Sequence, residues 1–293
     1  MAFAPEHFGN PLREQALLAQ GQAWTWLSRD VVEVSGADRL SYLTTVSSQV
    51  LTDLENDGSS RQVLFLDANG HILYAALAVA ALVPDSGEQS VLLLVDAGCG
   101  EGLAQLLNSR RFMLRVQAQL RPDWQVAGAM GDAVQKLADV VENLVTTWSD
   151  PWPGITPGGS TYFTGTRHPG ANYRAGGVVV ALEAGQTAPG QEQAPGPSQA
   201  ATSGSAAVSS QEAAQQVAGP SQAATSGQEP GQAAGLTQGL TQVGELAWEA
   251  LRIEAGLPRW AREVDARAIP NELDWLRTGV HLNKGCYPGQ ETI

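Results

Sequence analysis

A long stretch of small and polar residues, from Gly185 to about Val243, divides this 293-residue chain into two parts. It consists almost entirely of Gln, Ala, Gly, Ser, Pro and Thr, and it has no aromatic residue. The segment 196–204 recurs unchanged at 219–227, but two copies without an apolar ladder do not make a solenoid. Such a stretch cannot bury enough apolar area to offset the entropy of ordering it. We therefore predict a disordered insertion over 185–243 and a fold assembled from its two flanks.

The charge balance narrows the choice of partners. Asp and Glu (30 residues) outnumber Lys and Arg (17 residues), which gives a formal net charge of −13. A protein that grips a phosphate backbone is expected to carry a basic footprint, so a direct nucleic-acid partner is disfavoured. The chain has two lysines, Lys136 and Lys284, and a lysine inside a motif is therefore informative.

The sequence also indicates a compartment. Two cysteines, Cys99 and Cys286, allow one disulfide at most, which fits a reducing environment. The N-terminus has neither the basic flank nor the apolar core of a signal peptide. The longest apolar run, 72–83, is shorter than the ~18–20 residues that a spanning helix needs. We expect a cytoplasmic, soluble protein with no membrane partner.

Strand and helix patterns alternate along the first part of the chain. Val32 and Val34 alternate with polar residues before Gly36, and Asp38 can then cap a helix. Ala68-Asn69-Gly70 is typical of a hairpin turn. The patterns predict strands at 30–36, 63–67, 72–83, 90–96, 112–118 and 178–182, and helices at 39–43, 102–107 and 245–254. This mixture predicts an α+β fold with a mixed α/β core.

The helix predicted at 245–254 carries a stripe that ends in a carboxylate. Ala247, Ala250, Leu251 and Glu254 recur at the spacing of one helical face. Gly256 and Pro258 follow where a helix should stop. Glu254 either lies solvated at the rim of this face or meets a polar ligand at the edge of a pocket, and spacing alone favours the first reading.

The densest chemical signal is at the end of the chain, in the segment 284–291, Lys-Gly-Cys-Tyr-Pro-Gly-Gln-Glu. In a locally extended backbone Lys284 and Cys286 share a face, because side chains alternate. An ammonium near a thiol favours the thiolate, which could act as a nucleophile, a redox centre or a metal ligand. The alternative is a small buried cysteine that only packs.

Other chemistries lack their motifs. The chain contains no G-x-S-x-G, no P-loop and no H-E-x-x-H. Two cysteines cannot hold an iron–sulfur cluster alone, and the four histidines show no close ligand spacing for zinc. Cys286 could still lend one ligand to a cluster on a partner. Most of the eight tryptophans are expected in the core, although an indole at a pocket could stack on a planar heterocycle.

Together these segments resemble a known family. The segment 284–291 is similar to the K-G-C-[FY]-x-G-Q-E signature of the YgfZ family of folate-binding proteins, relatives of the glycine-cleavage aminomethyltransferase (GcvT). The segments 251–258 and 269–272 resemble the pieces that precede this signature. The segments 32–43 and 66–72 match the early strand, helix and hairpin, so the resemblance covers about 30–184 and 244–293.

The resemblance implies a folate-binding α/β core followed by a C-terminal β-barrel. It implies tetrahydrofolate or a related folate as ligand, and iron–sulfur enzymes or cluster-assembly proteins as partners, with an indirect effect on tRNA modification. By the same resemblance Cys286 is the functional residue, tuned by Lys284. Trp248 and Glu254 would contact the pterin, which favours the pocket reading for Glu254. Tyr287 and Gln290 of the signature would complete the folate-binding set.

Two departures from the family pattern bear on activity. The aminomethyltransferases carry a catalytic carboxylate in a run after the hairpin turn, and the matching position here is Ala75. The family barrel would follow Ile293, where this sequence ends, so we expect a chain without that barrel. Whether it is an enzyme stays open, but Ala75 argues against a classical aminomethyltransferase.

The sequence thus predicts four parts: an N-terminal extension (1–25), the first part of a folate-binding core (26–184), the insertion (185–243), and the second part of the core with the signature (244–293). The leading hypothesis is a folate-binding accessory protein for iron–sulfur cluster assembly or repair. The alternatives are a true aminomethyltransferase and a binding-only remnant that lacks the barrel.

Overall fold

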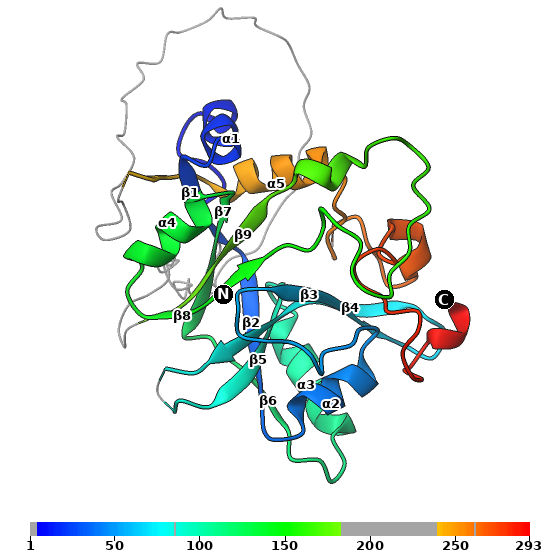
Figure 1. Cartoon of the computed structure of the whole chain (residues 1–293). Coiled ribbons are helices and arrows are strands. Elements are labelled where there is room, and N and C mark those ends of the chain that lie inside the picture. The colour runs from blue at the N-terminus through cyan, green and yellow to red at the C-terminus, as the bar shows by residue number, and fades with distance from the viewer. Residues whose placement is uncertain (1–4, 85, 183–238, 261) are drawn as a thin grey trace, which may run out of the picture. The chain divides into compact units, whose positions relative to one another are not determined.

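Two five-stranded sheets, with helices on their outer faces, form the part of the chain that the structure describes (Figure 1). The computed structural model describes residues 5–84, 86–182, 239–260 and 262–293, which all belong to one compact unit. The first sheet has the order β10-β1-β7-β9-β8 and the second the order β3-β4-β5-β2-β6. Neighbouring strands are antiparallel, except that β10 runs parallel to β1.

The elements have the following bounds. The strands are β1 (Ala23–Leu27), β2 (Arg29–Ser35), β3 (Ser60–Leu66), β4 (Ile72–Leu82), β5 (Gln89–Asp96), β6 (Gln117–Leu120), β7 (Trp124–Met130), β8 (Leu144–Ser149), β9 (Ala175–Ala181) and β10 (Thr241–Gln242). The α-helices are α1 (Pro11–Ala19), α2 (Arg39–Val46), α3 (Gly100–Arg110), α4 (Ala133–Val140) and α5 (Glu245–Glu254). Short 3-10 helices are η1 (Pro169–Asn172), η2 (Pro270–Leu273) and η3 (Gln290–Thr292).

Apolar side chains form three layers around these sheets. The largest cluster lies between the sheets and includes side chains of α5, such as Trp248. A second cluster packs α2 and α3 on the outer face of the second sheet, around residues such as Phe65 (Figure 1). A third packs α4 on the outer face of the first sheet and contains Trp24. Because helices cover the outer faces, the inner faces of the two sheets remain available for a binding site.

The predicted mixed α/β fold is confirmed, and most predicted elements match observed ones. The helix predicted at 245–254 has the same bounds as α5, and the turn at 68–70 joins β3 to β4. The strand predicted at 112–118 is largely wrong, because β6 begins only at Gln117. Phe112 has a left-handed backbone (φ 48°) and is exposed, so the alternation of apolar residues there reflects a turn.

Asp38 lies at the N-cap position of α2, as predicted, but its side chain does not cap the helix. Its carboxylate instead accepts hydrogen bonds from the backbone N–H and the guanidinium of Arg115. The hydrogen bonds from Arg115 hold the pKa of Asp38 below its ordinary value. This pair joins the start of α2 to the segment before β6.

Two predicted boundaries differ from the structure. The disordered insertion predicted at 185–243 falls mostly outside the described residues, but its last residues form β10, which pairs with β1. Val243 is fully buried there. The predicted N-terminal extension, 1–25, contains α1, whose Glu14 accepts the N–H of Gly244 at the start of α5. The fold therefore includes residues on both sides that the sequence pattern left out.

The end of the signature packs on the turn between β3 and β4. Gly70 (φ 83°) and Gly289 (φ 80°) both adopt left-handed backbone conformations. A Cβ atom on Gly289 would lie 2.5 Å from the carbonyl oxygen of Asp67 and 2.8 Å from Cα of Gly70. Conversely, a Cβ on Gly70 would meet the Cβ of Thr292 at 2.8 Å. The glycines therefore let two backbone turns approach more closely than any side chain allows.

We predict that Gly289→Ala lowers the free energy of unfolding by about 2–4 kcal/mol, since it combines a left-handed backbone with overpacking. Gly285→Ala is the matched control: a Cβ there meets no atom within 4 Å and the backbone is not left-handed. We expect it to change stability by less than about 1 kcal/mol. Urea denaturation of both variants tests this, and equal losses would contradict the close-approach interpretation.

Candidate binding site between the sheets

A cavity of about 110 Å³ lies between the two sheets and the segment that follows α5. Since one water needs about 10–15 Å³ of such space, the cavity has room on the order of eight waters, which is comparable to one bicyclic ring. Ala75 on β4, Trp148 on β8 and Trp248 on α5 line it. Its other lining residues are Leu27, Arg29, Gln62, Ala76, Leu77, Leu94, Asp96, Val126, Asp150, Pro151, Tyr173, Arg252, Leu257, Pro258, Arg259, Trp260 and Trp275.

Three polar groups on residues that line this cavity are buried without a hydrogen-bond partner. They are the indole N–H groups of Trp148 and Trp275 and the hydroxyl of Tyr173, and none has a partner among the described residues. All three side chains are less than a tenth exposed. Buried donors normally have partners, because an unpaired one costs about 1–3 kcal/mol. The walls of this cavity therefore contain donors that no group of the described residues satisfies.

The aromatic rings also fix the shape of the cavity. The ring of Trp248 meets Trp148 edge to face at 5.9 Å between centroids, and Tyr173 at 6.4 Å. On another wall, Trp260 stacks on Tyr74 at 6.1 Å. Such rings can pack on a flat heterocycle.

Two carboxylates, Asp96 and Asp150, line the same cavity, and of these Asp150 has no ion pair among the described residues. It follows β8, and its Oδ1 accepts the backbone N–H of Trp152 at 2.9 Å. Burial raises the pKa of Asp150 to about 6, although the backbone hydrogen bond and the charges of Arg29 and Arg277 act in the opposite direction. A carboxyl group in this state changes charge within the physiological range.

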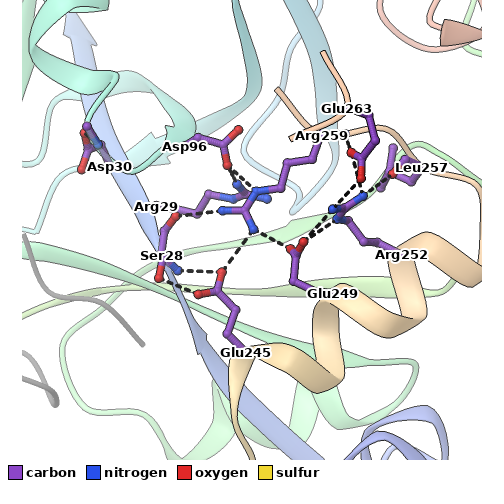
Figure 2. Close-up of polar contacts among 11 residues, drawn as sticks. Ser28, Arg29, Asp30, Asp96, Glu245, Glu249, Arg252, Leu257, Arg259 and Glu263 are labelled. Atoms are coloured by element: carbon purple, nitrogen blue, oxygen red, sulfur yellow. Dashed lines mark hydrogen bonds and ion pairs between the residues drawn. The ribbon is translucent and has the colours of Figure 1, made fainter. Parts of the chain in front are cut away.

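Beside the cavity lies a network of ion pairs centred on Arg259 (Figure 2). The guanidinium of Arg259 pairs with Asp96 at the end of β5 and with Glu249 on α5. It also lies 3.4 Å from Oε1 of Glu245, which accepts the N–H of Ser28 at 3.1 Å. Three segments distant in the sequence thus meet at one buried cation.

Two further arginines extend the network. Arg252 donates to Glu249 at 2.6 Å and to Glu263 at 3.0 Å, while Arg29 pairs with Asp96. Burial and the neighbouring charge of Arg259 lower the pKa of Arg29 to about 10. Burial opposes ionisation of Glu249, but the hydrogen bonds of Arg252 and the charge of Arg259 outweigh it and lower the pKa of Glu249. These arginines therefore stay charged beside the cavity.

We predict that Arg259→Met lowers the free energy of unfolding by about 3 kcal/mol, because the buried Asp96 and the half-buried Glu249 lose a partner. Arg61→Met is the matched control, since Arg61 pairs only with the exposed Asp53 and such pairs contribute less than about 1 kcal/mol. Chemical denaturation measures both losses. A loss for Arg259→Met as small as that of the control would refute a structural role for the network.

The structure separates the two residues predicted to hold a pterin. Trp248 is buried and lines the central cavity. Glu254 is exposed and lines a second cavity of about 510 Å³, together with Lys136 and Arg174. Tyr173 lines both cavities. The buried face of α5 differs from the predicted one. In the structure the buried residues of this helix are Ala247, Trp248 and Arg252.

Cys286 lies elsewhere. Its side chain is exposed and lines a third cavity, of about 670 Å³, whose walls include Tyr42 and Phe112. None of the residues around this cavity lines the central one. Both cysteines of the chain are free thiols. The structure therefore does not bring Cys286 together with Trp248 or Glu254.

The ammonium of Lys284 lies at the end of α2. It donates to the carbonyl oxygens of Thr44 and Ser47, and it lies 4.4 Å from the ring centroid of Tyr287. Among the described residues, its contacts do not include the sulfur of Cys286. Burial lowers the pKa of Lys284 to about 8. A cation here satisfies carbonyl groups that the end of the helix leaves free.

The remaining signature residues contribute to packing. Tyr287 is buried in the cluster between the sheets and also lines the third cavity. Gln290 begins η3 and is half-buried. Neither residue lines the central cavity. Their predicted contact with folate therefore stays a prediction.

Sequence reasoning missed several residues of the central cavity. Asp150, Tyr173 and Arg259 belong to no motif, and they come from segments that follow a strand or a helix. Asp150-Pro151 after a strand is the one local signal that could have drawn attention, because a carboxylate at a strand end often faces a site. Ala75, which the sequence singled out, does line the cavity.

Within the described ranges, no group of three or more His, Cys, Asp or Glu side chains is arranged to hold a metal ion. None of the described helices combines the length and the apolar character needed to cross a bilayer.

Comparisons with known proteins identify the fold. A crystal structure of the glycine cleavage system aminomethyltransferase T from Bartonella henselae superposes with a TM-score of 0.55 and 16% sequence identity, over 97% of this chain and 65% of that protein. This chain has the aminomethyltransferase T fold. A chloroplastic protein of Arabidopsis thaliana, named as a candidate transferase, is 44% identical over 62 residues, which are 20% of this chain and 13% of that protein. No protein-family profile matches.

The chain spans less than two thirds of the length of either protein. At 16% identity the structural likeness shows the fold alone, and the chemistry depends on the residues of this chain.

Proposed function

We propose that the central cavity binds the pterin ring of tetrahydrofolate or a related reduced folate. The supporting observation is the set of three buried, unpartnered donors on Trp148, Trp275 and Tyr173, which line one cavity among aromatic walls. The pyrimidine half of a reduced pterin is flat and offers acceptors at its 4-oxo oxygen and at N1, so it suits both features. The aminomethyltransferase T fold of the chain supports the same ligand class.

We propose binding rather than aminomethyl transfer. Ala75 lines the cavity where the resemblance expects the catalytic carboxylate, and a methyl group cannot accept or donate a proton. No turnover is therefore expected when the protein is incubated with tetrahydrofolate and an aminomethyl donor.

Titration of the full chain with 5-formyltetrahydrofolate, followed by calorimetry and tryptophan fluorescence, tests the binding proposal. We expect one ligand per chain, and a several-fold weaker affinity for Trp148→Phe, which removes one donor but keeps a ring. Trp26→Phe is the matched control, because the Trp26 N–H is also buried and unpartnered but lies in the α4 layer, away from the cavity. Absence of binding at millimolar ligand, or equal effects of the two variants, would exclude this site.

The second part of the proposal concerns Cys286. The signature resembles that of proteins that support iron–sulfur enzymes, and the exposed thiol is available to such a partner or to a cluster-assembly protein. We propose that Cys286 serves this role at a surface separate from the folate cavity.

In cells that depend on this protein, we predict that Cys286→Ala abolishes the support of an iron–sulfur enzyme but leaves folding and folate affinity unchanged, because the side chain is exposed. The half-buried Cys99 provides the control variant Cys99→Ala, which should retain that support. The measurement is the activity of the dependent enzyme in extracts. Full activity with Cys286→Ala would remove this residue from the proposal.

A further inference from the structure

We infer that Asp150 selects the ligand of the central cavity: its carboxylate accepts the two N–H groups on the 2-amino edge of a 2-amino-4-oxo heterocycle. The inference rests on the proposed function for the ligand class and goes beyond it in naming the residue and the edge recognised. The inference also places the carboxylate on a different strand from the one expected. β4 contributes Ala75 to the cavity wall, and the acidic group is Asp150, which follows the end of β8.

The hydrogen bonding of Asp150 leaves capacity for a ligand. Its Oδ1 accepts one N–H, from Trp152, and among the described residues it has no ion pair and no second hydrogen bond. A carboxylate can accept about four hydrogen bonds. Asp150 is one of the residues that line the cavity, so a ligand bound there can fill the free positions.

The surrounding charges do not neutralise Asp150. Arg29 pairs with Asp96, and Arg277 pairs with Asp274 and donates to the carbonyl oxygens of Trp152 and Gly154. A half-buried carboxylate without a paired cation costs free energy, and such groups gather at functional sites. Two N–H donors from a ligand would stabilise its charged form.

The other polar groups of the cavity complement this arrangement. Trp148, Trp275 and Tyr173 provide donors, while Asp150 provides the acceptor. A 2-amino-4-oxo ring carries the inverse set, with acceptors on its oxygen and ring nitrogens and two donors on one edge. A 2-oxo ring replaces the amino donor by an acceptor, which would face the carboxylate and be repelled.

Glu254 is the rival carboxylate, because the family resemblance implies that it contacts the pterin. It is exposed and lines the second cavity, away from the unpartnered indoles. Solvent competes for its hydrogen bonds there, so it would discriminate weakly between ligands.

The test compares two rings that differ at position 2 and at the adjacent N1: pterin (2-amino, N1 an acceptor) and lumazine (2-oxo, N1 a donor). For the unchanged protein we expect pterin to bind at least tenfold more tightly than lumazine at pH 7. For Asp150→Asn we expect an at least tenfold weaker affinity for pterin and loss of the preference, since an amide cannot accept two donors as a carboxylate does. Glu254→Gln should retain both affinities.

The variant should fold, because the amide oxygen of Asn can still accept the N–H of Trp152. Circular dichroism and thermal unfolding check this. Glu142→Gln is the charge control: it removes one exposed carboxylate just before β8, at the opposite end of that strand from Asp150. It should bind pterin as the unchanged protein does.

The pH dependence gives an independent readout. Because burial raises the pKa of Asp150 to about 6, pterin affinity should fall as the pH decreases through 6 and level off above 7. The charged and titratable groups around Asp150 are Arg29, Arg277 and Tyr173, and burial raises the pKa of Tyr173 above its ordinary value, so none of them titrates in this range. Asp150→Asn should show no such dependence.

The outcomes separate the two proposals. If neither pterin nor 5-formyltetrahydrofolate binds the unchanged protein, the proposed function fails. If they bind but Asp150→Asn keeps the preference for pterin, or if Glu254→Gln loses it, the folate site stands and the assignment of Asp150 is overturned. If guanosine, which presents the same edge, displaces pterin while 5-formyltetrahydrofolate does not bind, the edge recognition stands and the folate proposal fails.

Discussion

The buried guanidinium of Arg259 is the contact on which the rest of this structure depends. Its partners are Asp96 at the end of β5 and Glu249 on α5, and Glu249 is shared with Arg252. These pairs fasten the segment after residue 239 to sheets built from the first part of the chain. Buried ion pairs contribute little net stability relative to apolar packing, but removing one partner is costly. The network therefore fixes where α5 sits and, through Trp248, the shape of the central cavity.

The polar groups of the central cavity lower the stability of the protein when no ligand is bound. Three unpartnered donors and the half-buried carboxylate of Asp150 each cost free energy in the absence of a ligand. The surrounding ion pairs and aromatic contacts hold these groups in place despite that cost. A ligand that satisfies them gains affinity without having to order them first, because the walls are preformed.

Much of the architecture could be predicted from local patterns, whereas the site could not. The helix α5 and the turn at 68–70 follow from periodicity and turn chemistry, which act over a few residues. The buried stripe of α5 was misplaced because Arg252, a charged residue, is buried through its pairs with Glu249 and Glu263. Those partners are visible only in three dimensions. Asp150 was missed for the same reason, since its burial depends on walls supplied by other segments.

The crossing of Gly70 and Gly289 has a consequence for the order in which the protein is made. On the ribosome the β3–β4 turn emerges long before the residues that cover it, because Gly289 follows Gly70 only after most of the described fold. The turn therefore stays uncovered until that later segment has been synthesised. Contacts of such long sequence separation slow folding. The segment 284–291 would then close late in folding, over a hairpin that has already formed.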